Sequence, residues 1–461
     1  MSEGQAVGRG DAAPTRIGVV DARFALAALL VIVAAGLGGA SRENPLRLAV
    51  VELCALPLVA LAVRRAMSGK VGRTDAAGFA LALLAMIIAV PLLQLIPLPP
   101  GVWTAAPGQA ARAEALRLAR LPTPWLPLSL SPGDTARAVL ALIPPAAMLV
   151  ATLRLDASER RRLAWLWIVL AVAGLALGLA QVAAPSGGPA YPYRTTNVGS
   201  LVGLFANRNH EAGFLLALLP FAAALAMSAG PGEPRRTGPR GRDGAPWMAW
   251  LFILVSIVAL GVIRSRAGLI LAAPATLAAI SVAWRGRDWR VGGRPMAAIA
   301  AAIGPAALAV ALFGLDPILV RFDGHAPAEF RFEAWPQVIA AARSFLPLGS
   351  GLGSFDRVFE AVEPLSLVGP TYFNHAHNDF LELWLETGWV GAAILALFLA
   401  WFIPAAWRAW RSGVPLAQAA SAAVMLLMAQ SVVDYPLRTE TLAILFAFCC
   451  GVLAAPGRPG P

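Results

Sequence analysis

Long apolar stretches recur along the whole chain, and they constrain its fold more than any other feature. Several approach or exceed the roughly 20 residues that a helix needs to cross the hydrocarbon core of a bilayer. Inside lipid every backbone N–H and C=O must be satisfied within its own segment, so we expect helices rather than open strands. The sequence therefore predicts an all-α polytopic membrane protein of about twelve transmembrane helices. The predicted spans are 24–40, 46–63, 76–97, 136–153, 163–184, 211–229, 247–263, 267–284, 295–315, 388–407, 415–433 and 440–456.

The composition agrees with a chain that lies largely in lipid. Of its 461 residues, 58% are hydrophobic and 14% are charged, whereas soluble domains are about half apolar or less. The net charge of +11 raises the question of nucleic-acid binding. However, the basic residues fall in short clusters between apolar runs, and they form no basic stripe interleaved with aromatic residues. We therefore expect membrane lipids around the chain and no nucleic-acid partner.

The basic clusters also predict the orientation. With the N-terminus in the cytoplasm, every inside segment is rich in arginine, as the positive-inside rule requires. An even number of spans then places both termini in the cytoplasm. The inside clusters are Arg64, Arg65, Lys70 and Arg73; Arg154, Arg160, Arg161 and Arg162; Arg235, Arg236, Arg240 and Arg242; Arg285, Arg287, Arg290 and Arg294; and Arg408 and Arg411.

This orientation divides the chain into five parts. Because long loops in compact proteins are usually functional, the largest outer loop attracts most interest. The parts are a cytoplasmic tail (1–23), spans one to nine (24–315, with an outer loop at 98–135), a large outer loop (316–387), spans ten to twelve (388–456) and a second cytoplasmic tail (457–461). In the first outer loop, a short amphipathic stretch with Arg112, Glu114 and Arg117 could lie along the membrane interface.

Three polar groups lie at the predicted outer face, where the positional rule does not call for them. Arg264 and Arg266 form the turn between spans seven and eight, and paired guanidiniums suit bidentate binding of phosphate. Membrane-edge anchors are the alternative reading. The segment from Asn207 to Glu211 opens span six and is either a solvated helix cap or a polar cluster lining a cavity. Asp434 and Arg438 flank the last outer turn, where an ordinary ion pair is the alternative.

The densest polar constellation runs from Asn374 to Asp379 and contains His375 and His377. Histidine is the side chain best suited to accept a proton near neutral pH, and a neighbouring carboxylate or amide could hold its tautomer. Asn378, Glu382 and Glu386 follow at intervals of four and so share one helical face.

Two other interpretations of this histidine block remain open. His375, His377 and Asp379 could bind a metal ion, but positions i and i+2 of a helix point apart, so we expect no metal. The histidines could also be structural. The nearby glycine-rich segment 349–355 lacks the spacing of a nucleotide-binding loop and predicts a backbone turn.

Together these segments resemble the O-antigen ligase and O-antigen polymerase superfamily of bacterial envelope glycosyltransferases. The resemblance covers roughly residues 195–445, and the histidine block followed by Glu-x-Gly-x-x-Gly is its most specific part. The matching pieces are Asn207, Arg208 and Asn209 with Gly213; Ser265 and Arg266 with Gly268; Arg331 with Trp335; Pro347 through Phe355; His375, His377 and Asn378 with Leu381, Glu386, Gly388 and Gly391; and Asp434 through Arg438.

The resemblance implies a fold like that of other multi-helix (GT-C-like) glycosyltransferases, with the large periplasmic loop forming a lid. It implies a glycan donor carried on undecaprenyl pyrophosphate, transfer without metal or other cofactor, and a location in the bacterial inner membrane with the active site facing the periplasm. His377 would be the base, and Arg264 or Arg266, together with Arg208, would hold the pyrophosphate. The predicted catalytic residues are His377, His375, Asn378 and Glu386, and the predicted substrate-binding residues are Arg264, Arg266, Arg208, Asn207, Asn209, Arg331, Asp434 and Arg438.

Because a lipid pyrophosphate is already activated, direct attack by an acceptor hydroxyl would invert the anomeric centre. The acceptor could be lipid A-core, the growing glycan or a protein hydroxyl. The alternative function is a secondary transporter or exporter of an anionic or lipid-linked substrate. Transporters, however, usually place ionisable groups near the middle of the bilayer and show related halves.

Overall fold

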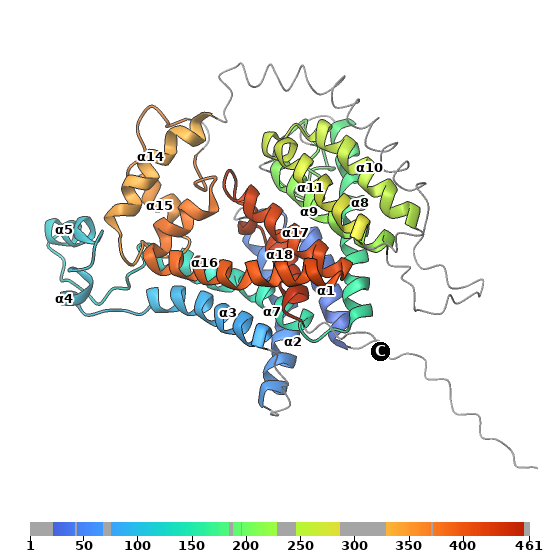
Figure 1. The fold of residues 1–461 in the computed structure, drawn as a ribbon. Helices are drawn as coiled ribbons and strands as arrows, with labels where there is room; N and C mark the ends of the chain where they lie inside the picture. Colours follow the sequence, from blue (N-terminus) through green and yellow to red (C-terminus); the bar gives the residue numbers. More distant parts are fainter. Residues whose placement is uncertain are drawn as a thin grey trace, which may run out of the picture.

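The computed structural model describes residues 22–41, 44–67, 75–183, 188–194, 196–227, 246–285, 329–369 and 372–455 (Figure 1). These residues form helices and loops, and the pairing of Leu98 with Leu126 is an isolated bridge. Every predicted span is helical except 295–315, which lies outside the described residues. The long apolar helices are α1 (Ala22–Leu37), α2 (Pro45–Met67), α3 (Asp75–Gln94), α6 (Pro132–Ala141), α7 (Ile143–Thr152), α8 (Ala157–Ala183), α9 (Arg208–Met227), α10 (Pro246–Ile263), α11 (Arg266–Arg285), α16 (Asp379–Ser412), α17 (Pro415–Gln430) and α18 (Glu440–Ala454).

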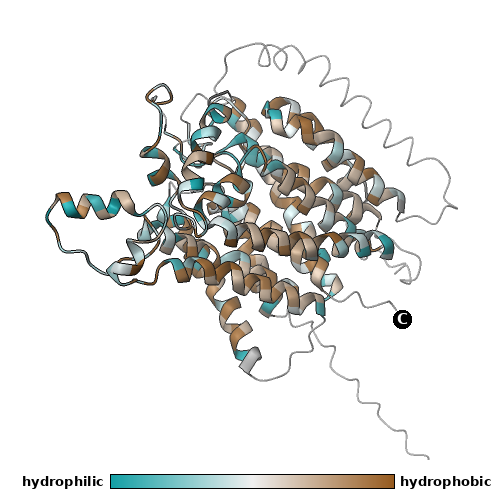
Figure 2. Cartoon of the chain, turned by 60° about the vertical axis from the view of Figure 1, so that its left-hand side comes forward, coloured by the Kyte–Doolittle hydropathy of each residue, from teal (hydrophilic) through white to brown (hydrophobic). Residues whose placement is uncertain are grey.

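Seven helical segments of the described chain are long and apolar enough to cross a membrane: α2, α3, α6 with α7, α8, α9, α11 and α16. Helices α1, α10, α17 and α18 are apolar but shorter. The prediction of an all-helical, multi-pass membrane protein is therefore confirmed for the described residues, while the count of twelve spans stays a prediction. Figure 2 shows hydrophobic residues along most of the bundle and hydrophilic residues gathered to one side, among shorter helices and loops.

Helix α9 is the centre of the bundle. It packs against α8, α10, α11 and α17, and 94% of its most apolar 18-residue stretch is buried inside the protein. A helix that is hydrophobic on all sides can be covered by other helices or by lipid, and α9 is covered by other helices. By contrast, only 17% of the corresponding stretch is buried in α2 and in α3, so these helices expose apolar faces suited to lipid.

Several polar segments that are distant in sequence meet at one end of this bundle. The Gln430 side chain at the end of α17 donates to the backbone oxygen of Asn209 at the start of α9, over 2.7 Å. The backbone N–H of Asp379 at the start of α16 donates to Ser431, over 2.9 Å. At the start of α11, a side-chain atom added to Gly268 would touch Ala212 of α9. The order of the helices therefore brings these termini together.

The two predicted outer loops pack against each other beyond this end. The first carries α4 (Pro100–Trp103) and α5 (Ala110–Leu118), and the second carries α14 (Glu329–Ser344) and α15 (Phe355–Glu360). The predicted amphipathic stretch is α5. The Ser350 backbone oxygen accepts from the Leu130 N–H over 2.9 Å, and the Leu352 oxygen accepts from Thr135 Oγ1 over 2.7 Å. Figure 1 shows α14 and α15 beyond the first turns of α16.

Helix α16 begins nine residues before the span predicted at 388–407, because Asn378 caps it. The Asn378 side chain accepts hydrogen bonds from the backbone N–H groups of Phe380 and Leu381. The predicted boundary coincides instead with a kink at Gly388, whose φ is 58° and ψ is −141°. The backbone there lies against the glycine-rich turn, and the Trp389 N–H donates to the Pro347 oxygen over 2.9 Å.

We predict that Gly388→Ala destabilises the protein more than Gly413→Ala, the matched control. Both glycines have positive φ, but a Cβ at position 388 would overlap the Pro347 carbonyl, whereas nothing lies within 4 Å of one at position 413. We expect a loss above about 2 kcal/mol for the first variant and about 1 kcal/mol for the second. Thermal unfolding in detergent measures both, and equal losses would contradict the role of the kink.

Candidate functional site

The histidine block meets the turn between α17 and α18 through His377 and Asp434. His377 Nδ1 lies 3.1 Å from Asp434 Oδ1. The His377 side chain keeps 14% of its surface exposed, while Asp434 is fully buried. The backbone of His377 has a φ of 50°, which is uncommon for a residue other than glycine. Within the described part of the chain, no hydrogen-bond partner occupies Nε2 of this imidazole.

Burial and charge set the protonation of this pair in opposite directions. Burial lowers the pKa of His377 below its ordinary value of 6.5, although the hydrogen bond to Asp434 partly counteracts this. Burial alone would raise the pKa of Asp434, but the hydrogen bond from His377 and the charges of His210 and Arg331 hold it below its usual range. At neutral pH, Asp434 is therefore ionised and His377 is a neutral imidazole. Such a pair can accept a proton at Nε2.

Tyr435 joins three histidines beside this pair. Its ring centroid lies 4.2 Å from that of His375, 4.8 Å from that of His377 and 4.9 Å from that of His210. Burial, followed by the charge of Asp434, raises the pKa of the phenol to about 12, and its hydroxyl hydrogen-bonds the side chains of Asn374 and Asn207. Tyr435 therefore stays neutral and fixes the relative positions of the rings.

Arg331 of α14 brings a partly exposed positive charge to the site. Its Nη1 lies 4.0 Å from Asp434 Oδ1, and 28% of its side chain is exposed. Trp335, one helical turn later, donates from Nε1 to the backbone oxygen of Ala376 over 3.0 Å. This bond attaches α14 to the histidine block, so the predicted lid helix and the predicted base lie together.

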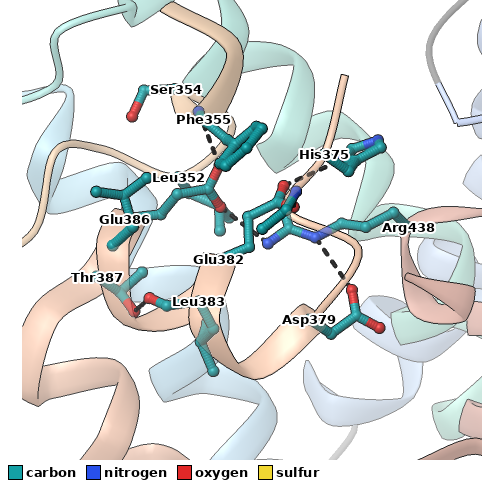
Figure 3. A network of polar contacts seen from close by, with 12 residues as sticks. Leu352, Ser354, Phe355, His375, Asp379, Glu382, Leu383, Glu386, Thr387 and Arg438 are labelled. Atoms are coloured by element: carbon teal, nitrogen blue, oxygen red, sulfur yellow. Dashed lines mark hydrogen bonds and ion pairs between the residues drawn. The ribbon is translucent and has the colours of Figure 1, made fainter. Parts of the chain in front are cut away.

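Arg438 faces three carboxylates of α16 (Figure 3). Its guanidinium lies 3.6 Å from Asp379, 3.4 Å from Glu382 and 3.0 Å from Glu386. Burial alone would lower the pKa of Arg438, but the three acidic side chains raise it above its ordinary value, so it stays charged. Glu386 also accepts a hydrogen bond from the backbone N–H of Phe355 over 3.2 Å. This cluster connects α16, the glycine-rich turn and the 3₁₀ turn η2 (Pro436–Arg438).

His375 is buried, and its hydrogen-bond partners differ from that of His377. Its Nδ1 lies 2.9 Å from Glu382 Oε1, and its Nε2 lies 3.1 Å from Ser41 Oγ. The metal arrangement considered from the sequence is thus not formed, because His375, His377 and Asp379 face different partners. In the described ranges, no group of three or more His, Cys, Asp or Glu side chains is arranged to hold a metal ion.

The polar segment that opens α9 contributes mainly to the local frame. Asn207 Oδ1 accepts from the Asn209 N–H over 2.9 Å and so caps the helix. The Arg208 backbone N–H donates to Asn197 Oδ1 over 3.0 Å, and its guanidinium lies 3.4 Å from Ser200 Oγ. Buried His210 lies 4.0 Å from Asp434 Oδ2. Asn207 thus caps α9, but Asn209, His210 and Glu211 are buried rather than solvated. A cavity lined by this segment stays a prediction.

The turn with Arg264 and Arg266 lies between α10 and α11. Arg264 is exposed and has a φ of 56°, and Arg266 is partly exposed. Ser265 Oγ caps α11 by accepting from the Gly268 N–H over 3.0 Å. Because Gly268 at the start of α11 lies against Ala212 at the start of α9, both arginines lie at the same end of the bundle as the polar start of α9.

Sequence reasoning missed Gln94, the last residue of α3. Its side-chain amide donates to the Glu386 backbone oxygen over 2.9 Å and accepts from the Leu352 N–H over 2.9 Å. Its only signal was a buried polar residue at the end of an apolar run. Sequence reasoning also missed Ser41, because no local pattern marks this residue in the short segment between the first two predicted spans.

Diethyl pyrocarbonate, which acylates neutral imidazole, should modify His377 before His210 or His375. The reason is that His377 combines an accessible ring with a lowered pKa, while the side chains of the other two are 2% exposed. The rate should therefore reach half its maximum below pH 6.5. Peptide mass spectrometry over a pH series measures this, with His377→Asn as the control. Faster modification of His375 would contradict the geometry.

One segment that contributes to this site matches a known protein family. Residues 250–396 match the family model described as O-Antigen ligase. No curated protein matches the chain. The matched segment contains the Arg264–Arg266 turn, α14, the glycine-rich turn and the histidine block, which are pieces on which the resemblance rested. The match therefore supports the resemblance to the O-antigen ligase and polymerase superfamily, and the long apolar helices of the described residues indicate a multi-pass membrane protein.

Proposed function

We propose that this protein transfers a glycan from undecaprenyl pyrophosphate to an acceptor hydroxyl at the periplasmic face of the bacterial inner membrane. The observation that carries the proposal is the His377–Asp434 pair, which offers an accessible Nε2 at the polar end of an apolar bundle. The arginine distribution supports the orientation, because the same end corresponds to the outer side when both termini are cytoplasmic. The match of residues 250–396 to the O-Antigen ligase model supports glycosyl transfer in general.

The proposed reaction is a single displacement at the anomeric carbon. The acceptor O–H gives its proton to His377 Nε2 while its oxygen forms a bond to that carbon. The bond from the carbon to the phosphate oxygen breaks, and the lipid pyrophosphate departs with the electron pair. Asp434 keeps the proton of His377 on Nδ1 and stabilises the imidazolium that forms. Attack opposite the leaving group inverts the anomeric centre.

The leaving pyrophosphate gains negative charge, which arginines fixed in a site of low dielectric stabilise strongly. Arg331, one of the predicted substrate-binding residues, lies 4.0 Å from Asp434, the partner of the proposed base. We assign the pyrophosphate to Arg331 together with Arg208, Arg264 and Arg266. The activated phosphate supplies the driving force, so the mechanism requires neither a metal ion nor another cofactor.

The remaining predicted site residues hold the frame in this proposal. Arg438 is committed to three carboxylates, and Glu386 divides its oxygens between Arg438 and the backbone of Phe355. Asn378 caps α16 and Asn207 caps α9. We assign the base to His377 rather than His375, because both ring nitrogens of His375 already face partners.

His377→Ala should lower glycan transfer by roughly 10²- to 10⁴-fold, the usual contribution of a general base. Asp434→Asn should also slow transfer, because an amide can donate to Nδ1 and stabilise the wrong tautomer. Wild-type activity should be lost as the pH falls through the lowered pKa of His377, below 6.5. Removal of the Asp434 charge lowers that pKa further, so the acidic limb should move to lower pH.

The measurement is transfer from a purified lipid-linked donor in proteoliposomes, with lipid A-core, a second glycan and a protein offered as separate acceptors. Product linkage by NMR reports the stereochemistry. Normal transfer by folded His377→Ala would remove this residue from the mechanism, and a retained anomeric configuration would exclude the single displacement.

Arg331→Ala should raise the KM for the donor and lower kcat, because the guanidinium would bind the pyrophosphate in the substrate and bind it more strongly in the transition state, where its negative charge grows. The matched control is Arg357→Ala on α15, since that arginine is largely exposed and lies 3.5 Å from Glu360, three residues away. We expect a loss of at least about tenfold in kcat/KM for the first variant and little change for the second. Equal kinetics of the two variants would remove Arg331 from the donor site.

A further inference from the structure

A second chain of polar contacts runs from α16 to the segment after α1. It consists of Glu382, His375 and Ser41, with 2.9 Å between Glu382 Oε1 and His375 Nδ1 and 3.1 Å between His375 Nε2 and Ser41 Oγ. With the proton on Nδ1, the imidazole donates to Glu382 and accepts the hydroxyl proton of Ser41. A hydroxyl, an imidazole and a carboxylate in this order are the arrangement by which enzymes activate a serine nucleophile.

The imidazole and the carboxylate are held in this geometry by contacts of their own. Glu382 Oε2 accepts from the backbone N–H of Ala376 over 2.9 Å, and Arg438 lies 3.4 Å from Oε1. The ring of Tyr435 packs on that of His375. Because both oxygens of Glu382 are engaged, the carboxylate keeps one orientation toward the imidazole.

Ser41 is placed by the turn that ends α1. The Gly38 oxygen accepts from the Thr441 N–H over 3.2 Å. The Gly39 N–H donates to the Tyr193 hydroxyl over 2.8 Å, and the Gly39 oxygen accepts from another loop. Ser41 itself is partly exposed, whereas His375 and Glu382 are buried. The hydroxyl is thus the member of the trio that an incoming molecule can reach.

We propose that Ser41, His375 and Glu382 form a second reactive centre, which hydrolyses carboxylic esters and is separate from the His377–Asp434 pair. An ester suits the trio, because its carbonyl carbon accepts a serine oxygen and its alkoxide leaves with a proton. The ester is carried by an acylated sugar or by an acyl lipid, both of which present the same chemistry to the hydroxyl. This activity does not depend on the proposed glycan transfer.

The reaction balances without a cofactor. Ser41 Oγ bonds to the acyl carbon and gives its proton to His375 Nε2, and the departing alkoxide takes that proton as the ester C–O bond breaks. Water then attacks the acyl-serine and gives its proton to His375. The proton passes to Ser41 Oγ as the acid leaves, which restores the free hydroxyl.

A fluorophosphonate probe tests the trio directly on the full-length protein in detergent. We expect one covalent adduct on the peptide that contains Ser41, and none in Ser41→Ala. His375→Asn should slow labelling at least about 100-fold, the smallest usual effect of a general base. Ser366, an exposed serine without an imidazole partner among the described residues, is the matched control and should stay unlabelled. Absence of an adduct at Ser41 in monodisperse protein, or an unchanged rate in His375→Asn, would overturn the proposal.

Two substrates then distinguish the sources of the ester. Ser41-dependent release of acetate from an O-acetylated hexose would identify a glycan ester, and Ser41-dependent release of fatty acid from phosphatidylglycerol vesicles would identify a lipid ester. If neither acetate nor fatty acid is released, the proposed hydrolase activity is overturned. Ser41→Ala should keep full glycan transfer and His377→Ala should keep full probe labelling, so that each function can fail without the other.

Discussion

The contact of one guanidinium with three buried carboxylates is the interaction on which the site depends. Arg438 follows α17, whereas Asp379, Glu382 and Glu386 line one face of α16. Removing one partner of a buried ion pair usually costs about 3–5 kcal/mol, because a charge is left without compensation. The first turns of α16 can therefore take their place only when the outer turn between α17 and α18 is folded. Ionic contact between distant segments, rather than local helix preference, sets the position of the histidine block.

Hydrogen bonds connect this cluster to the rest of the site in two directions. Toward α15, Glu386 fixes the backbone of Phe355 and, through its own carbonyl, meets Gln94 of α3. Toward the bundle, Asp379 accepts from the Ser431 hydroxyl over 2.8 Å, three residues before Asp434. His377 thus sits between two elements that are both tied to the same cluster, which suits a base that must keep one orientation.

The apolar runs were sufficient to locate the helices, because a long segment in lipid has few alternatives to a helix. The i, i+4, i+8 spacing likewise indicated correctly that Glu382 and Glu386 share a face, and the block of polar residues identified the neighbourhood of His377. The sequence alone could not predict which residues the two histidines contact. His377 pairs with a carboxylate 57 residues away, and His375 with a serine 334 residues away. Such pairings depend on how helices pack, so Gln94 and Ser41 carried no local pattern that could reveal them.

The enclosure of α9 has a consequence for how the chain is assembled in the membrane. Helices that enter the bilayer before α9 can cover only one side of it. The opposite side is completed by α10, α11 and α17, and α17 begins at Pro415, long after α9 ends at Met227. During biosynthesis that flank of α9 must therefore contact lipid or an insertion factor until most of the chain has been made. Helix α17, near the end of the chain, thus completes the enclosure of a central helix that is synthesised near the midpoint.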